Sequence, residues 1–322
     1  MKILNFVKKQ KDKLVIGFLV KCLIILCIPL VYQHFAKTYP TDLPPAPAPA
    51  PVEEENAFVP TFANLSEIQT MDDILAHLFY VDSTAFAMAE DFPIEKLASL
   101  DLSLNLVSSV PRVLITHTHS QEFFIDSEEG NMSQSIVAVG RYLADILVGL
   151  GISVVHDTGI YDMVDGELKR EGSYERMEQG VLRILEEHPH IELIIDLHRD
   201  AAPDGVHLIT EIDGRPTAKI MFFNGITRRN IEGEPKDLDE FFNPYIQENL
   251  ALSLQLFLTA NEMYPNLARR NYVKAYRYSL HLKPRSILVE VGANTNTLEE
   301  AKNAMYPLSR LITQVVGVGE AQ

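Results

Sequence analysis

Two histidines and a glutamate follow a short apolar run in the first half of the chain. Residues 112–117 are predicted to form a β-strand, and His117, His119 and Glu122 come at its end or just after it. His119 and Glu122 are three residues apart, so one helical turn or a tight loop brings both side chains to one cavity. Because imidazole and carboxylate groups are metal ligands, this segment is a candidate metal site.

The same pattern occurs at a second predicted strand, residues 191–197. His198 ends this strand, and the alternation of side chains along a strand places Asp196 on the same face as His198. Asp200 lies two residues further along. A histidine and further carboxylates thus stand where a second strand ends, which is expected if one site is assembled from distant segments.

Glu290 belongs to a third apolar segment, the predicted strand 286–291. A carboxylate that enters a buried central strand is desolvated, and desolvation raises its pKa toward that of a useful general base. The alternative is that Glu290 emerges from the sheet into water or pairs with Arg285.

Together these residues have the composition of a catalytic zinc site. Two imidazoles and one carboxylate leave a fourth tetrahedral position open for water. The only cysteines, Cys22 and Cys27, lie in the apolar N-terminal stretch, so a metal elsewhere in the chain is held by His, Asp or Glu. The alternative interpretation is that His117 or His119 is a hydrogen-bonded histidine at the rim of the sheet, and Glu122 a solvated surface charge.

The elements that position these residues alternate between strand and helix from residue 109 onward, which is typical of an α/β fold. We expect a mixed, largely parallel sheet with helices on both faces. Ser173 can cap the helix that follows it, and Thr297 with Glu300 forms a capping box. The predicted strands are 112–117, 152–156, 191–197, 206–210, 219–223 and 286–291, and the predicted helices are 134–149, 173–187, 240–263 and 297–316.

The N-terminal part predicts a membrane anchor. Residues 14–33 are long and apolar enough to span a bilayer as a transmembrane helix. Five lysines and one aspartate precede them, which predicts a cytoplasmic tail over 1–13 and an exported domain. A Pro/Ala-rich linker follows over 34–56, then a flanking subdomain over 57–108 and the catalytic domain over 109–322. The alternative is a cleaved secretory signal, which also exports the domain.

Charge and composition narrow the class of partner. The chain of 322 residues is 47% apolar and carries a formal net charge of −16. Since nucleic acid is polyanionic, this charge argues against a nucleic-acid partner.

Three short segments, taken in this order, resemble the stage II sporulation protein P family, the membrane-anchored relatives of zinc-dependent N-acetylmuramoyl-L-alanine amidases. The resemblance covers roughly residues 109–316. The segments are His119-Ser-Gln-Glu122, Asp196-Leu-His198-Arg-Asp200 and Val289-Glu290-Val-Gly292.

This resemblance implies a zinc amidase, or phosphorylase/hydrolase-like, fold and a role for each matched residue. It implies that Zn²⁺ is held by His119, Glu122 and His198, and that Glu290 is the catalytic carboxylate. His117 is then a neighbour of the ligands. Asp196, Arg199 and Asp200 lie within a matched segment and orient His198 or the substrate.

The activity implied by the resemblance is hydrolysis of the N-acetylmuramoyl-L-alanine amide bond of peptidoglycan during sporulation (engulfment). The resemblance also implies cleavage of stem-peptide cross-links. It further implies attachment to the cell membrane through a single N-terminal helix, with the catalytic domain outside, and partners among sporulation membrane or wall-hydrolase proteins. Two alternatives stay open. One is a catalytically silent, membrane-tethered scaffold that binds peptidoglycan. The other is a metal-free glycosidase that uses the paired carboxylates Glu122 and Glu290.

Overall fold

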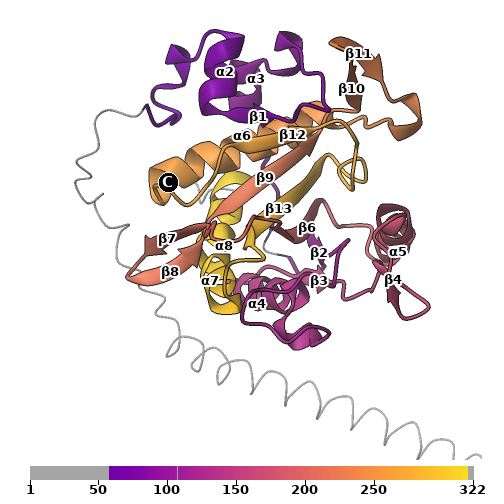
Figure 1. Cartoon of the computed structure of the whole chain (residues 1–322). Coiled ribbons are helices and arrows are strands. Elements are labelled where there is room, and N and C mark those ends of the chain that lie inside the picture. The colour runs from indigo at the N-terminus through magenta and orange to yellow at the C-terminus, as the bar shows by residue number, and fades with distance from the viewer. Residues whose placement is uncertain (1–57, 107, 318–322) are drawn as a thin grey trace, which may run out of the picture. The chain divides into compact units, whose positions relative to one another are not determined.

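A seven-stranded mixed sheet forms the centre of the structure, a computed structural model that describes residues 58–106 and 108–317. Neighbouring strands run parallel except at the β13–β9 pair, which is antiparallel and joins two parallel halves (Figure 1). The predicted mixed, largely parallel sheet is confirmed. The strands in sheet order are β1 (Phe79–Val81), β12 (Asn271–Lys274), β9 (Ile220–Gly225), β13 (Arg285–Ala293), β6 (Leu193–Asp200), β2 (Val113–Thr116) and β3 (Val154–His156).

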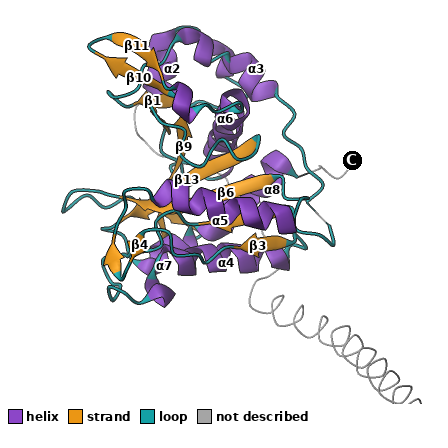
Figure 2. Ribbon diagram, turned by 90° about the vertical axis from the view of Figure 1, so that its right-hand side faces the viewer, coloured by secondary structure: helices purple, strands orange, loops and turns teal. Residues whose placement is uncertain are grey.

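Helices cover both faces of this sheet, as predicted. One face packs against α4 (Ile136–Gly149), α6 (Ile246–Met263) and α8 (Met305–Val316). The other face is covered by α5 (Ser173–Glu187) (Figure 2). Met177 and Val181 of this helix form one buried cluster with Leu114 of β2 and Ile194 of β6. Successive side chains along a strand point to opposite faces of the sheet, so the position of a residue in its strand determines which set of helices its side chain contacts.

Residues 58–106 extend the sheet and cover α6. Strand β1 pairs with β12 at the sheet edge, and α3 (Ile94–Ser99) packs on α6. Residues Asn249–Ala260 of α6 are buried all round because the sheet and neighbouring helices enclose this helix. The segment expected as a flanking subdomain therefore contributes to the same sheet and the same compact unit as the residues after 109.

The remaining elements are short and lie in the connections between the main strands and helices. They are α2 (Met71–His77), α7 (Leu298–Asn303), the hairpins β4–β5 (Met163–Val164, Glu167–Leu168), β7–β8 (Ile209–Ile212, Arg215–Ala218) and β10–β11 (Arg228–Ile231, Glu234–Asp237), and four 3₁₀ helices, η1 (Leu65–Glu67), η2 (Ala89–Asp91), η3 (Met132–Gln134) and η4 (Asp239–Phe241).

Two predicted helix ends need correction. Ser173 does not cap α5, because the residue before the helix is Gly172, with φ 73°, and Ser173 begins the helix itself. The helix predicted from residue 240 begins at Ile246, since residues 239–241 form η4 and Pro244 precedes the helix. The capping box of Thr297 and Glu300 is confirmed at α7.

The predicted tail 1–13, anchor 14–33 and linker 34–56 lie outside the described residues. Within residues 58–106 and 108–317, no helix has the length and apolar character needed to cross a membrane.

Candidate active site

The predicted residues of the second and third segments meet on the α5 face of the sheet. Glu290 on β13 and His198 on β6 are partners in the strand register, and Asp196 is the register partner of Thr116 at the end of β2. The expectation that distant strands bring these side chains to one place is confirmed. The side chains can meet because β2, β6 and β13 are adjacent and parallel, so their carboxyl ends share one rim.

His198 lies between two buried carboxylates. Its Nε2 is 2.9 Å from Oδ1 of Asp196, and its Nδ1 is 3.5 Å from Oε2 of Glu122. Burial opposes a charge on the imidazole, but Asp196 and Glu122 together raise the pKa of His198 well above its ordinary value. The ring thus lies between two opposite charges, with Nδ1 turned toward Glu122, although the short contact of Nε2 with Asp196 does not have hydrogen-bond geometry.

Asp196 is the group that fixes the other side of His198. Its carboxylate accepts hydrogen bonds from the backbone N–H and the hydroxyl of Thr118 and from the hydroxyl of Ser279. Burial alone would raise the pKa of Asp196, but His198 and these donors hold it below its ordinary range. Asp196 is thus a charged, fully buried carboxylate, held by Thr118 and Ser279, that lies 2.9 Å from Nε2 of the imidazole.

Glu122 is 3% exposed and is held by backbone and side-chain donors. The backbone N–H of Arg199 donates to its Oε2 at 2.9 Å, and Nη1 of Arg170 lies 3.5 Å from its Oε1. Burial opposes ionisation, but His198 and His119 lower its pKa. Glu122 is therefore an ionised carboxylate inside the protein and not a solvated surface charge.

His119 completes the cluster from the loop after β2. Its ring meets the ring of His198 edge to face at a centroid distance of 5.3 Å, and that of Tyr174 at 5.6 Å. Its Nδ1 lies 3.4 Å from Oγ of Ser173. Burial and the neighbouring His198 lower the pKa of His119 to about 4, which leaves a neutral imidazole able to donate an electron pair.

Glu290 has part of the environment expected from its sequence, since the residue is half-buried and one of its carboxylate oxygens is enclosed. Its Oε2 is buried and has no hydrogen-bond partner among the described residues. Burial, followed by the charges of the neighbouring carboxylates, raises the pKa of Glu290 to about 8, although His198 acts against this shift. The alternative pairing with Arg285 is wrong, because that side chain donates to the carbonyls of Leu102 and Ser103.

A local irregularity follows Glu290. The β13–β6 register shifts between Glu290 and Ala293, and Gly292 there has a φ of 59°. A Cβ at this glycine would lie 2.7 Å from Oδ1 of Asn296, so a side chain does not fit without movement.

His117 faces the other side of the sheet. Its Nδ1 lies 2.9 Å from the carbonyl oxygen of Leu197 and its Nε2 lies 3.0 Å from Nε2 of His156. Gly140 of α4 leaves the space for the ring, since a Cβ there would lie 2.4 Å from it. Burial and His156 lower the pKa of His117 to about 3. His117 is thus a neighbour that supports β6 from behind.

Arg199 and Asp200 make structural contacts at the same rim. Nε of Arg199 donates to the carbonyl of Phe123, and Oδ2 of Asp200 pairs with Nη1 of Arg269 at 2.7 Å. Through its side chain and its backbone N–H together, Arg199 ties the loop of Glu122 to the end of β6.

The donor set fits a zinc ion in its chemistry. Two ligands of one tetrahedral zinc lie about 3.4 Å from each other, and Nδ1 of His198 and Oε2 of Glu122 are 3.5 Å apart. In the part of the chain that the structure describes, however, no three His, Cys, Asp or Glu side chains already converge as a complete metal site. Nδ1 of His119 lies toward Oγ of Ser173, at 3.4 Å.

Two residues of α5 were missed from the sequence. Ser173 and Tyr174 contact His119, and burial, followed by the charges of Asp196 and Glu290, raises the pKa of Tyr174 well above its ordinary value. Nothing in the sequence around the first turn of this helix indicates that these two residues lie near His119, because only the packing of α5 on the sheet brings them there.

The fold and the site define a class of protein. It is an α/β protein in which two histidines and three carboxylates, those of Glu122, Asp196 and Glu290, gather at the carboxyl ends of adjacent strands. The chain belongs to the family described as Stage II sporulation protein P, whose match spans residues 53–313. No curated relative matches the chain.

Several solved structures show a distant likeness. The N-acetylmuramoyl-L-alanine amidase AmiC2 of Nostoc punctiforme is 17% identical over 63% of this chain and 96% of its own, with a TM-score of 0.37. The CwlD amidase of Clostridioides difficile, solved in complex with the GerS lipoprotein, is 13% identical over 63% and 98%, with a TM-score of 0.38. An N-acetylmuramoyl-L-alanine amidase of Clostridium difficile 630 is 13% identical over 64% and 97%, with a TM-score of 0.39. At these scores the family membership rests on the match over residues 53–313 alone.

Proposed function

We propose that this protein is a zinc-dependent N-acetylmuramoyl-L-alanine amidase that cleaves peptidoglycan during engulfment. The observation that carries the proposal is the pairing of Glu290 with His198 across β13 and β6, beside Glu122. It puts a carboxylate of raised pKa next to an imidazole–carboxylate pair whose separation suits two ligands of one metal. Membership in the stage II sporulation protein P family supports the wall substrate and the role in sporulation.

In this proposal His119, Glu122 and His198 hold Zn²⁺. When bound, this ion lowers the pKa of its water and polarises the scissile carbonyl. Asp196 contacts Nε2 of His198 and thereby leaves Nδ1 free to face Glu122. The backbone N–H of Arg199 holds Glu122 in the orientation that a ligand requires.

Glu290 moves the protons. It accepts a proton from the attacking water as the new C–O bond forms, and it passes a proton to the leaving nitrogen as the C–N bond breaks. The products are the lactyl carboxylate of muramic acid and the free amino group of L-alanine. The direction of its pKa shift suits this role, because burial raises the pKa of Glu290 toward neutral pH, where a carboxyl group can both accept and return a proton.

The proposal extends to placement and to a second bond. Residues 14–33 anchor the chain in the cell membrane, and the linker 34–56 holds the catalytic domain outside the cytoplasm. The same site hydrolyses amides of stem-peptide cross-links, and other sporulation membrane or wall-hydrolase proteins act with it on the wall.

The test is the identity of the bond that is cut. Purified peptidoglycan is digested with the protein, and the new end groups are determined. Stem peptides with a free L-alanine amino group and intact glycan strands are expected, and chelation with EDTA should stop their release. New reducing sugar ends that persist in EDTA would support the metal-free glycosidase. Absence of any new end group, with peptidoglycan still bound, would support the silent scaffold.

A further inference from the structure

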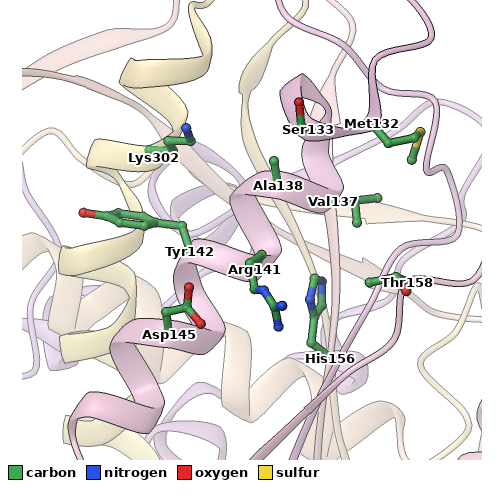
Figure 3. A pocket seen from close by; sticks show the side chains of 10 residues that line it. All are labelled: Met132, Ser133, Val137, Ala138, Arg141, Tyr142, Asp145, His156, Thr158 and Lys302. Atoms are coloured by element: carbon green, nitrogen blue, oxygen red, sulfur yellow. The ribbon is translucent and has the colours of Figure 1, made fainter. Parts of the chain in front are cut away.

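A cavity of about 550 Å³ lies on the α4 side of the sheet, away from the face that carries Asp196 and His198. It is formed by the first turns of α4, the end of β3, the loop after it, and α7. Figure 3 shows Arg141 and Asp145 on α4, His156 at the end of β3, and Lys302 on α7 at its wall. None of these residues belongs to the proposed catalytic set.

The two cations of this pocket, Arg141 and Lys302, form no ion pair in the part of the chain that the structure describes, although the chain has 44 acidic residues against 28 basic ones. Asp145 follows Arg141 by one helical turn, yet no ion pair joins them in the described structure. Two cations and one carboxylate leave the pocket with a positive charge, which suits an anionic ligand. The planar guanidinium of Arg141 is suited to bidentate contact with a carboxylate.

His156 adds a second requirement. A carbonyl can only accept, so His117 carries its proton on Nδ1, which faces Leu197. Neutral, buried His117 then accepts through Nε2, and His156 donates its Nε2–H to it. This leaves Nδ1 of His156 as an acceptor. That atom is buried and has no partner among the described residues, so a hydrogen-bond donor from the pocket reaches it once a neighbouring side chain, such as the exposed Arg141, moves aside.

We propose that this pocket binds the carboxyl end of a short peptide, with the carboxylate at Arg141 and the terminal amide N–H at Nδ1 of His156. Figure 3 shows the guanidinium beside the imidazole, and the charge of Arg141 acts on His156. A peptide terminus carries a carboxylate and an amide N–H on the same residue, so one ligand supplies both an anion for Arg141 and a hydrogen-bond donor for His156. A fully deprotonated anion pairs with Arg141 but has no hydrogen to donate to His156.

The source of the peptide follows from the position of the pocket. Its wall includes Met132, whose sulfur contacts the amide of Gln121, the residue before Glu122. The pocket therefore borders the loop that carries the candidate ligands. This step rests on the proposed function: the peptide is a stem peptide of peptidoglycan, which ends in a free carboxylate, and the pocket selects the end of the stem.

The experiment measures binding and not turnover. The full-length chain is titrated calorimetrically with N-acetyl-D-alanyl-D-alanine, with the C-terminal amide of the same dipeptide, and with inorganic phosphate. Arg141→Gln removes the cation from an exposed position, and Ala138→Leu fills the cavity without a change of charge. Lys236→Gln, an exposed residue on β11, is the matched control for loss of one positive charge.

The free dipeptide is expected to bind, and its amide to bind at least about tenfold more weakly, because a hydrogen bond to a charged group is lost. Arg141→Gln and Ala138→Leu should weaken binding to a similar extent, while Lys236→Gln leaves it unchanged. Equal binding of acid and amide, or unchanged binding in Arg141→Gln, would overturn the proposal. Phosphate that binds as tightly as the dipeptide would overturn the assignment to a peptide. The dipeptide has no muramoyl amide, so this result is independent of whether the protein hydrolyses peptidoglycan.

Discussion

Glu290 and His198 are direct neighbours across two parallel strands, at a register that places both side chains on the α5 face of the sheet. The proposed base and a proposed ligand are thus positioned by backbone hydrogen bonds and not by loops. We therefore expect a change in one side chain to leave the backbone position of the other unchanged. This relationship makes it possible to separate metal binding from proton transfer by single substitutions.

The first prediction concerns Glu290→Gln. The amide keeps the shape of the side chain but cannot accept the proton, so turnover should fall by roughly a hundredfold or more. The zinc content, measured by atomic absorption, should stay at one per chain. Glu234→Gln, an exposed residue on β11, is the control and should keep full activity. Loss of zinc in Glu290→Gln would instead identify Glu290 as a ligand.

The second prediction orders the histidines by their contribution to metal binding. His198→Ala and His119→Ala should each lose zinc and activity together, because each removes a donor of the proposed site. His117→Ala should keep its zinc, since this ring faces α4. Zinc content and alanine release are measured on the three variants. If His198→Ala retains a full equivalent of zinc, the ligand assignment is wrong, and the reverse order of His117 and His119 would exchange their roles.

The sequence predicts those parts of this site that depend on local patterns of apolar and polar residues. Strands β2, β6 and β13 are predicted because each is a run of apolar, β-branched residues, and the alternation within them correctly places Asp196 beside His198. The raised pKa of Glu290 follows from the same reasoning, because burial of a strand implies desolvation of its carboxylate.

The contributions of helix α5 and of the antiparallel β13–β9 pair could not be predicted in the same way. Ser173 looks like a cap by residue type, yet Gly172 occupies that position and Ser173 contacts His119. The pairing of β9 against β13 joins residues far apart in sequence, and no local pattern specifies its direction. These features depend on tertiary packing, which cannot be predicted from residue type and periodicity.

The third prediction uses two glycines of α4. A Cβ at Gly140 would lie 2.4 Å from the ring of His117, whereas a Cβ at Gly149 meets nothing within 4 Å. Gly140→Ala should therefore lower the free energy of unfolding by about 1–3 kcal/mol through overpacking. Gly149→Ala should leave it unchanged or raise it by up to about 1 kcal/mol, since alanine favours a helix. Denaturant titration measures both. Equal effects of the two substitutions would show that the ring of His117 moves freely.

The fourth prediction concerns placement of the domain. Five lysines lie before residue 14, so protease added to intact protoplasts should degrade residues 58–322 and spare the cytoplasmic tail. Antibodies against the two ends distinguish the fragments. Protection of the whole chain, with degradation only after lysis, would contradict export and with it the wall substrate.

The last prediction is a pH dependence of stability in zinc-free protein. The pKa of His117 falls from 6.5 to about 3 on folding, because burial disfavours its charged form. Between these values the unfolded chain binds the extra proton, so this group's contribution to stability is complete above about pH 6.5 and declines as the pH falls toward 3. The decline is up to about 1.4 kcal/mol per pH unit. Free energies of unfolding are measured from pH 7 to pH 4.5 for the wild type and for His117→Ala. The variant should be less stable at pH 7, because Leu197 and His156 each lose a buried partner, and the difference should shrink as the pH falls. A difference that stays constant or grows on acidification would mean that His117 is charged in the folded protein.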